Sequence, residues 1–312
     1  MAPSARDRSK HAPVQVSEEL FAPVNGGIEL CYQTFGDPDA EPLVLVMGLG
    51  GPMTWWDSDF CEQLARAGFY VVRFDNRDIG RSSRAQGRVT RATLVRAFAG
   101  GRLRAPYTLD DMAADTFGLM DHLGFDDAHL VGASMGGMIV QTMAILEPRR
   151  VRSLTSIMST TGKRTVGWQS PSLLPTLISP RNSREDYVKG SAAVWRIIGS
   201  PAYPVDEAEG RQRAEETYDR GVPRSGVLRQ MVAVLKQPNR GARLHSLRVP
   251  TLVIHGLADK MVHVSGGRAT AAAIPGSELL LIDGMGHDLP PALTETFVGA
   301  IRRVADRAGR AG

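Results

Sequence analysis

Short apolar runs recur along the chain and are separated by turns and by segments with helical periodicity. Several of these runs are continuous rather than alternating, which favours strands covered on both faces, as in a parallel sheet. Turn residues bound them, as in the Asp-Pro-Asp sequence at 37–39 and at Gly68. Seven segments are predicted as strands on this pattern: 27–36, 42–47, 69–74, 129–133, 151–158, 249–256 and 278–282.

Helical patterns alternate with these strands. One covers 57–67 and ends before Gly68, and a short amphipathic piece covers 92–98. Another begins after Thr108, whose hydroxyl can cap a helix with acidic residues in its first turn, and runs to about residue 123. A third apolar helical pattern follows Gly137. Strands that alternate with helices predict an α/β fold, in which helices cover both faces of a parallel sheet.

The alternation stops between residues 162 and 243. This stretch shows no strand pattern, but helical patterns follow Ser183 and cover 205–220 and 225–237. We interpret it as a helical cap, or lid, over the carboxyl edge of the sheet. The predicted organisation is therefore a flexible tail at 1–16, a core formed by 17–161 and 244–312, and a cap at 162–243.

A chain of 312 residues can form one large α/β domain with an insertion, or two small domains. Because 43% of the residues are hydrophobic, it can bury a substantial core, and we do not expect disorder. No apolar run approaches the length of a membrane span. Residues 1–16 are polar and basic and lack the apolar stretch of a signal peptide, so we expect a cytoplasmic protein.

The net charge of +4 is concentrated in two places. Six arginines and no acidic residue lie between Arg84 and Arg104, and the stretch from 163 to 243 is also basic. The ordinary explanation is a solvated face. The alternatives are a guide for anionic substrates or a weak contact with an acidic lipid surface. No nucleic-acid-binding motif accompanies the charge, so nucleic acid is not an expected partner.

The segment 129–140 carries the clearest chemical signal. Its apolar run ends at Gly132, Ser134 stands at the tip of a small-residue turn, and Gly136 follows before the helical pattern begins. A serine on so sharp a strand-to-helix turn has strained backbone angles, and its neighbours need to be almost free of side chain. This spacing is the G-x-S-x-G nucleophile elbow. A packing turn is the plain alternative, so the rest of the chain must supply a base and an acid.

His287 and Asp259 are the expected base and acid. His287 lies in the glycine-containing loop 283–287 after the last predicted strand, and Asp259 follows the strand before it. The carboxyl ends of parallel strands share one edge of an open sheet, where ligands bind. A carboxylate there can accept one imidazole N–H while the other ring nitrogen takes the serine proton. The order Ser, Asp, His agrees with the elbow motif.

Two backbone amides are expected to form the oxyanion hole. Met135 follows the nucleophile and begins a helix, whose dipole adds positive character. Leu49 lies in the glycine turn 48–51 after the strand 42–47, and it is our choice for the second donor. A site of this kind needs neither a metal nor a cofactor.

The chain resembles the α/β-hydrolase superfamily from about residue 24 onward. Within it, the segments 46–50, 75–82 and 284–287 look most like the bacterial esterases that include aclacinomycin methylesterase, a branch with methionine before the oxyanion glycine, as at Met47. The resemblance implies an eight-stranded, mainly parallel sheet with a helical cap after the sixth strand, and the triad and oxyanion amides named above. The insertion around 84–104 is longer here, so polyketide specificity is not implied, and we read 75–82 as a structural turn.

The sequence thus predicts a serine carboxylesterase that forms an acyl-enzyme on small-to-medium apolar esters. Alternatives on the same triad are a lipase, thioesterase, lactonase or perhydrolase. An alternative of another class is a ligand-binding receptor without turnover. The oligomeric state is left open. Apolar side chains that could line the pocket, or simply form the core of the cap, are Trp168, Leu173, Leu174, Leu177, Trp195 and Met231.

Overall fold

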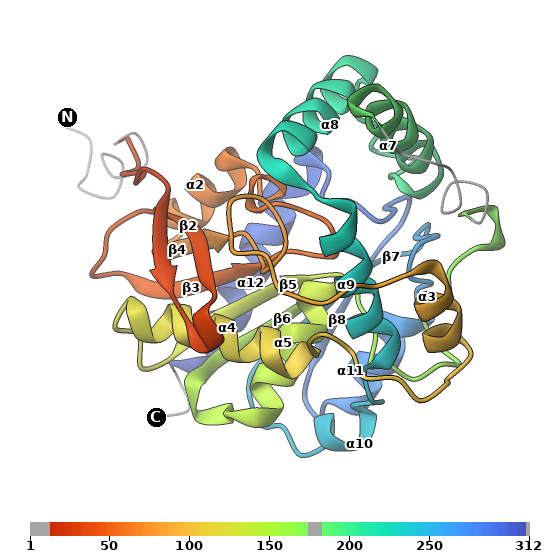
Figure 1. The fold of residues 1–312 in the computed structure, drawn as a ribbon. Coiled ribbons are helices and arrows are strands. Elements are labelled where there is room, and N and C mark those ends of the chain that lie inside the picture. Colours follow the sequence, from red (N-terminus) through yellow and green to blue (C-terminus); the bar gives the residue numbers. More distant parts are fainter. Residues whose placement is uncertain (1–12, 174–182, 310–312) are drawn as a thin grey trace, which may run out of the picture.

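The computed structural model describes residues 13–173 and 183–309, and its centre is a single eight-stranded sheet (Figure 1). The strand order is β1-β2-β4-β3-β5-β6-β7-β8. The first two strands are antiparallel to their neighbours and the other six run parallel. The strands are β1 Leu20–Pro23, β2 Glu29–Phe35, β3 Glu41–Val46, β4 Phe69–Phe74, β5 Ala128–Ala133, β6 Val151–Ile157, β7 Thr251–Gly256 and β8 Glu278–Ile282.

Helices cover both faces of this sheet, and each face has its own hydrophobic core. On one face α4 (Leu109–His122) and α5 (Met135–Leu146) pack against the strands. On the other face lie α2 (Ser58–Arg66) and α12 (Thr294–Ala308). The strands are buried because both faces are covered, which explains their nearly continuous apolar sequence.

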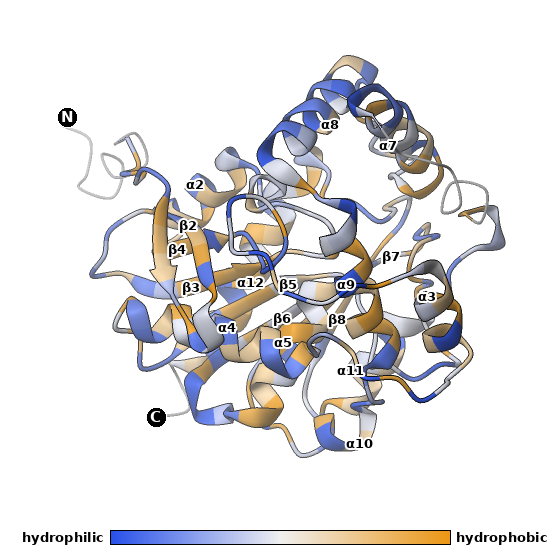
Figure 2. Ribbon diagram, in the orientation of Figure 1, coloured by the Kyte–Doolittle hydropathy of each residue, from blue (hydrophilic) through white to orange (hydrophobic). Residues whose placement is uncertain are grey.

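The cap lies between β6 and β7 and contains α7 (Arg184–Ile198), α8 (Glu207–Gly221) and α9 (Arg224–Lys236). Figure 1 shows α7 and α8 standing beyond the sheet on the side away from α10 (Gly241–Leu244). Figure 2 shows the contrast in chemistry, with apolar strands and a largely hydrophilic α8.

The predicted α/β-hydrolase fold is confirmed, with its mainly parallel eight-stranded sheet, helices on both faces and helical insertion after β6. The hydrophobic pattern did not reveal the short edge strand β1, nor α11 (Ser265–Ala273) and α12. The cap boundaries at 162 and 243 remain a prediction. Two residues of the predicted tail pair with β2, because Gln15 accepts a hydrogen bond from Gly36 and Val16 bridges to Phe35. Residues 1–12 lie outside the described part of the chain.

Candidate active site

Ser134 occupies a sharp turn between β5 and α5. Its φ of +55° and ψ of −116° place a non-glycine residue in a sparsely populated region, where strain is held by surrounding contacts. Those contacts leave no space for side chains on either side. A Cβ at Gly136 would lie 1.9 Å from the carbonyl oxygen of Val46, and one at Gly132 would lie 2.3 Å from that of Gly136. The two glycines therefore permit the close packing that holds the serine at the tip.

Three side chains from three strand-end loops form a hydrogen-bonded line. His287 Nε2 lies 3.0 Å from Ser134 Oγ, and His287 Nδ1 lies 2.7 Å from Asp259 Oδ2. Asp259 and His287 are buried, while Ser134 is partly accessible. The loops follow β5, β7 and β8, whose carboxyl ends lie at the same edge of the sheet (Figure 1). This arrangement can pass a proton from the hydroxyl to the imidazole and stabilise the resulting imidazolium.

The surroundings of Asp259 favour its ionised form. Burial alone would raise the pKa of this carboxyl, but the charge of His287 and hydrogen bonds from both His287 and His255 outweigh burial and hold the pKa well below its usual range. The backbone N–H groups of Met261 and Val262 also donate to Oδ1, each at 2.8 Å. The carboxylate is therefore fixed in position and in charge.

Two other buried histidines, His255 and His129, could in principle act as the base, but their ring nitrogens contact other groups. His255 is fully buried on β7; its Nε2 lies 2.8 Å from the carbonyl oxygen of Val262 and 3.4 Å from Asp259 Oδ2. His129 Nδ1 lies 2.8 Å from Ser153 Oγ, and burial lowers its pKa to about 4. Neither ring forms a hydrogen bond with Ser134.

The glycine turn after β3 lies directly against the nucleophile. A Cβ at Gly48 would be 3.1 Å from the Cβ of Ser134, which shows how closely this turn packs against the serine. The amide of Leu49 belongs to the next residue of the same turn. The first N–H groups of a helix have no intrahelical acceptor, which leaves the Met135 amide at the start of α5 available. The Leu49 N–H donates no backbone hydrogen bond within the described chain. The glycine before Leu49 thus packs against Ser134, and the assignment of the Leu49 and Met135 amides to an oxyanion hole remains a prediction.

The cap reaches this turn through one buried side chain of α9. Gln230 is fully buried; its Oε1 accepts a hydrogen bond of 2.9 Å from the N–H of Gly50, and its Nε2 donates to the carbonyl oxygen of Arg77 at 3.1 Å. Asp75 supports the same loop from the core, since its Oδ1 accepts a bond of 2.7 Å from the N–H of Met53. The turn that carries Leu49 is therefore held from two directions.

Two buried ion pairs join the cap to the segment 75–82. Arg220, at the end of α8, pairs with Asp75 at 2.8 Å and with Glu19 at 2.7 Å. Arg229 of α9 pairs with Asp78 at 2.6 Å. Both aspartates are fully buried. The prediction of a solvated basic face is therefore wrong for these two arginines, because each has a buried carboxylate partner in the core.

The histidine loop is held by the end of α7. The N–H of His287 donates to the carbonyl oxygen of Ile198 at 2.6 Å, and the N–H of Gly286 donates to Ser200 Oγ at 2.8 Å. The Ser200 hydroxyl in turn donates to Asp288, a buried carboxyl whose pKa is raised by burial. The cap thus contacts both the glycine turn 48–51, which we call the oxyanion turn after its predicted role, and the histidine loop 283–287.

The residues expected to line the pocket differ in their contacts and in their exposure to solvent. Trp195 lies edge-on to Trp55, with 5.4 Å between ring centroids, and the Trp55 ring packs against Gly51 of the oxyanion turn. Trp168 is half exposed and stacks on His263 at 4.0 Å. Leu173 is buried and Met231 is partly buried. Leu174 and Leu177 lie outside the described residues, and the pocket assignment remains a proposal.

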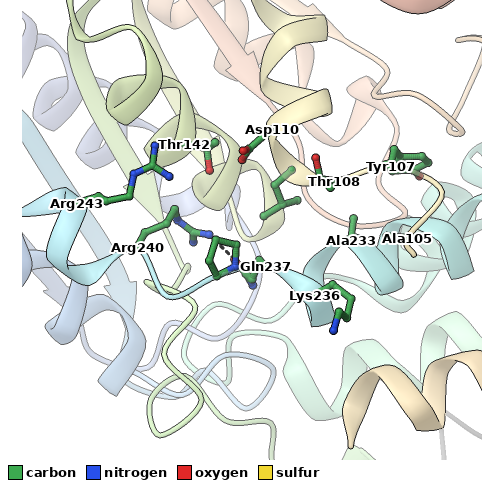
Figure 3. Close-up of a pocket in the computed structure, with 12 residues that line it drawn as sticks. Ala105, Tyr107, Thr108, Asp110, Thr142, Ala233, Lys236, Gln237, Arg240 and Arg243 are labelled. Carbon is green, nitrogen blue, oxygen red and sulfur yellow. Dashed lines mark hydrogen bonds between the residues drawn. The ribbon is translucent and has the colours of Figure 1, made fainter. Parts of the chain in front are cut away.

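A small cavity of about 100 Å³ lies away from these loops, between α4 and α9 (Figure 3). Its lining includes Tyr107, Asp110, Arg240 and Arg243, and none of the three hydrogen-bonded side chains. Arg240 is almost fully buried, which lowers its pKa to about 10, and it donates to neutral acceptors, among them the carbonyl oxygen of Thr160 at 2.8 Å. Like Arg220 and Arg229, Arg240 therefore contradicts the prediction that the basic residues of 163–243 form a solvated face.

Sequence reasoning missed Gln230 and Ser200 altogether, and it gave the charges of 75–82 only a structural role. Gln230 lies 180 positions from Gly50, and no local motif links the two residues. The sequence does contain one indirect signal for the contacts between cap and core. Asp75 and Asp78 are acidic residues of the core, and the predicted cap is basic, so ion pairs between them could have been expected.

The described residues also bear on membrane insertion and metal binding. None of the helices there is both long and apolar enough to cross a bilayer. No group of three or more His, Cys, Asp or Glu side chains there is placed to hold a metal ion.

Comparison with known proteins gives consistent matches. The family model of the alpha/beta hydrolase fold matches residues 41–290. Rhodomycin D methylesterase DauP of Streptomyces sp. (strain C5) is 30% identical over 88% of this chain and 94% of its own length. Rhodomycin D methylesterase DnrP of Streptomyces peucetius is 29% identical over 89% and 95%. The solved esterase RhEst1 from Rhodococcus sp. ECU1013 superposes with a TM-score of 0.71 at 20% identity, covering 93% of this chain and 99% of its own.

Proposed function

The chain belongs to the α/β-hydrolase family, and from that premise we propose that it is a serine carboxylesterase for small-to-medium apolar esters. The observation that carries the proposal is the hydrogen-bonded line from Ser134 through His287 to Asp259. The substrate that we propose is a small ester, and the catalytic groups all belong to the protein, with water as the second nucleophile.

In the first half of the reaction, His287 Nε2 takes the proton of Ser134 as Oγ attacks the ester carbonyl carbon. The carbonyl oxygen becomes an oxyanion, which the N–H groups of Leu49 and Met135 stabilise. The bond from carbon to the alkoxy oxygen then breaks, and His287 gives its proton to the departing alcohol. Asp259 stays ionised throughout and stabilises the imidazolium.

In the second half, water replaces the alcohol. His287 takes a proton from the water, whose oxygen attacks the acyl carbon, and the same amides hold the second oxyanion. The bond to Ser134 Oγ breaks, His287 returns the proton to that oxygen, and the carboxylic acid leaves. The buried, ionised Asp259 supports this cycle because it keeps the ring oriented in both halves.

The relatives narrow the substrate class that we propose. The two curated relatives are named as methylesterases, which favours a short alcohol part in the ester. On the cap side, Trp195 lies edge-on to Trp55 beside the glycine turn 48–51, and the Arg213 guanidinium stacks on Trp195 at 4.6 Å. This aromatic surface supports an apolar acid part in the ester. We therefore propose a carboxylic ester with a small alcohol and an apolar acid.

The test is a panel of 4-nitrophenyl esters of increasing acyl length together with methyl esters of the same acids. We expect turnover that falls by about 10⁴-fold or more in Ser134→Ala and by about 10⁴-fold in Asp259→Asn. Ser172→Ala, an exposed serine of the cap, is the matched control and should retain full activity.

A fluorophosphonate probe separates the remaining outcomes. Labelling of the wild-type protein but not of Ser134→Ala, together with turnover of the esters, supports the proposal. Labelling without turnover of any ester would favour the ligand-binding receptor instead. Faster turnover of thioesters or lactones than of every ester would assign the same triad to a different acyl bond.

A further inference from the structure

The helix α3 (Arg91–Phe98) presents two large apolar side chains to solvent. Val95 is 69% exposed and Phe98 is 73% exposed, the highest fractions for large hydrophobic residues in the described chain. They are three positions apart and so share one face of the helix. The helix packs against α9, and its Ala97 is fully buried. The exposed pair therefore belongs to a fixed helix whose other side is already covered.

The same segment carries positive charge without compensation. Residues 84–109 contain no Asp or Glu. Besides Arg84, which donates to the carbonyl oxygen of Gly80, four exposed arginines there form no ion pair with any carboxylate of the described chain: Arg88, Arg96, Arg102 and Arg104. Two exposed arginines of the cap differ, since Arg184 and Arg196 each have a carboxylate partner within 3.0 Å.

Neighbouring segments add further cations to this site. Arg164, in the segment after β6, donates to the carbonyl oxygen of Phe98, and Lys236 at the end of α9 donates to that of Gly101 at 3.2 Å. Trp168, 50% exposed, lies on the same segment as Arg164. Figure 1 shows α3 at the edge of the molecule beside α9, with no helix outside it. We define Val95, Phe98 and the four exposed arginines as the α3 surface.

We propose that the α3 surface docks onto an anionic phospholipid bilayer. An exposed apolar pair, with unpaired exposed arginines on its own helix and in the segments just before and after it, is the chemistry of an interfacial segment. The apolar groups enter the headgroup boundary while the cations attract acidic lipids. Charge complementarity selects an anionic surface, and the exposed Val95 and Phe98 select one with an apolar layer beneath its phosphates. The phosphate backbone of a nucleic acid would attract the arginines but would provide no apolar layer for Val95 and Phe98 to enter.

Docking in this orientation places α3 between the bilayer and α9. Because α9 also carries Gln230, which accepts the N–H of Gly50, two packed helices would connect the membrane surface to the glycine turn 48–51. The proposal does not depend on hydrolysis, since it concerns a surface outside the serine site. Each arginine near an anionic surface strengthens binding by about fivefold at low salt, and added salt screens the attraction.

The test is co-sedimentation of the full-length protein with vesicles. One set contains phosphatidylcholine alone, and the other contains equal parts of phosphatidylcholine and phosphatidylglycerol. We expect binding to the anionic vesicles at low salt, little binding to the neutral ones, and at least a tenfold loss of binding at high salt. The far-UV circular dichroism spectrum of each variant reports that the protein remains folded, whether or not it hydrolyses esters.

Two double variants separate charge from apolar insertion. Val95→Ser with Phe98→Ser and, separately, Arg102→Gln with Arg104→Gln should each lower binding to anionic vesicles by about tenfold or more. Matched controls at exposed positions elsewhere are Leu146→Ser for the apolar change and Arg149→Gln with Arg268→Gln for the charge change, and both should bind like the wild type.

Three outcomes would overturn the proposal. One is absence of binding to anionic vesicles. A second is equal loss in the control variants. The third is loss only in the arginine variant, with unchanged binding by the Val95→Ser, Phe98→Ser variant, which would assign the surface to a soluble acidic partner instead.

Discussion

The cap is joined to the core and held together internally in two different ways. Between α7 and α8 the ion pairs are exposed, as in the pair of Arg184 with Asp219, whose side chains are 45% and 57% exposed. Between the cap and the core the pairs are buried, and in the pair of Arg229 with Asp78 the exposed fractions are 7% and 0%. Exposed pairs contribute little to stability, whereas loss of one partner of a buried pair leaves an uncompensated charge.

The buried contacts also lie close to the loops of the candidate active site. Arg229 and Gln230 are consecutive on α9, and Gln230 bonds the oxyanion turn at Gly50. Asp75, which pairs with Arg220, also accepts the N–H of Met53. The difference teaches that the inner contacts of the cap fix both its position and the shape of the site, while its outer contacts fix neither.

The largest expected effect comes from breaking an inner pair. Arg229→Met should lower the free energy of unfolding by about 3–5 kcal/mol, because Asp78 would remain buried with only the Tyr107 hydroxyl, 2.7 Å away, and backbone groups as partners. Urea unfolding followed by circular dichroism measures this. The double variant Arg229→Met with Asp78→Asn should recover part of the loss. Equal stability of the single variant and the wild type would contradict the comparison.

A smaller loss is expected where the end of α7 meets the histidine loop. Ser200→Ala removes the acceptor of the Gly286 N–H and the donor to buried Asp288, so unfolding should become easier by about 1–3 kcal/mol. The pH dependence of kcat/KM should also change, since His287 follows Gly286 directly. The control is Ser172→Ala on the exposed side of the cap. If kcat/KM keeps its wild-type pH profile, the end of α7 does not position the imidazole.

The three side chains of the site could be predicted from the sequence because each signal is local. Ser134 is marked by glycines two positions away on either side, and the structure explains that spacing by the 1.9 Å approach at Gly136. Asp259 and His287 follow predicted strands, and parallel topology alone brings such loops to one edge. A sequence can therefore reveal a feature that depends on neighbouring residues, such as the serine turn. It can also reveal one that depends only on parallel strand order, such as the meeting of the three loops.

The cap anchors could not be predicted because their partners are distant and their chemistry is ambiguous. Arg229 and Asp78 are 151 positions apart. An arginine on an amphipathic helix has the same sequence signal whether it is solvated, as Arg196 is, or buried, as Arg229 is. Which of the two occurs depends on where the helix crosses the core, and that is set by long-range packing.

A further test separates positioning from stability at the oxyanion turn. Gln230→Ala should lower kcat about tenfold with little change in KM, because the Gly50 N–H loses its acceptor and the Leu49 amide is less well oriented toward the oxyanion. Gln212→Ala on α8, an exposed residue bonded to Glu216, is the matched control and should leave kcat unchanged. A rise in KM alone would instead assign Gln230 to ground-state binding.

The smallest effect should come from the outer contacts, and it is the test that most sharpens the comparison. Arg184→Ala removes both the Asp219 and the Glu215 pairs, yet those side chains are exposed and already solvated, so their loss costs little. We expect the midpoint of urea unfolding and kcat/KM to equal the wild-type values within error, at low and at high salt. A clear loss of stability that disappears at high salt would show that the outer ion pairs act as a network. In that case the distinction between the two kinds of contact would be one of degree, and the cap would depend on its surface as well as on its buried arginines.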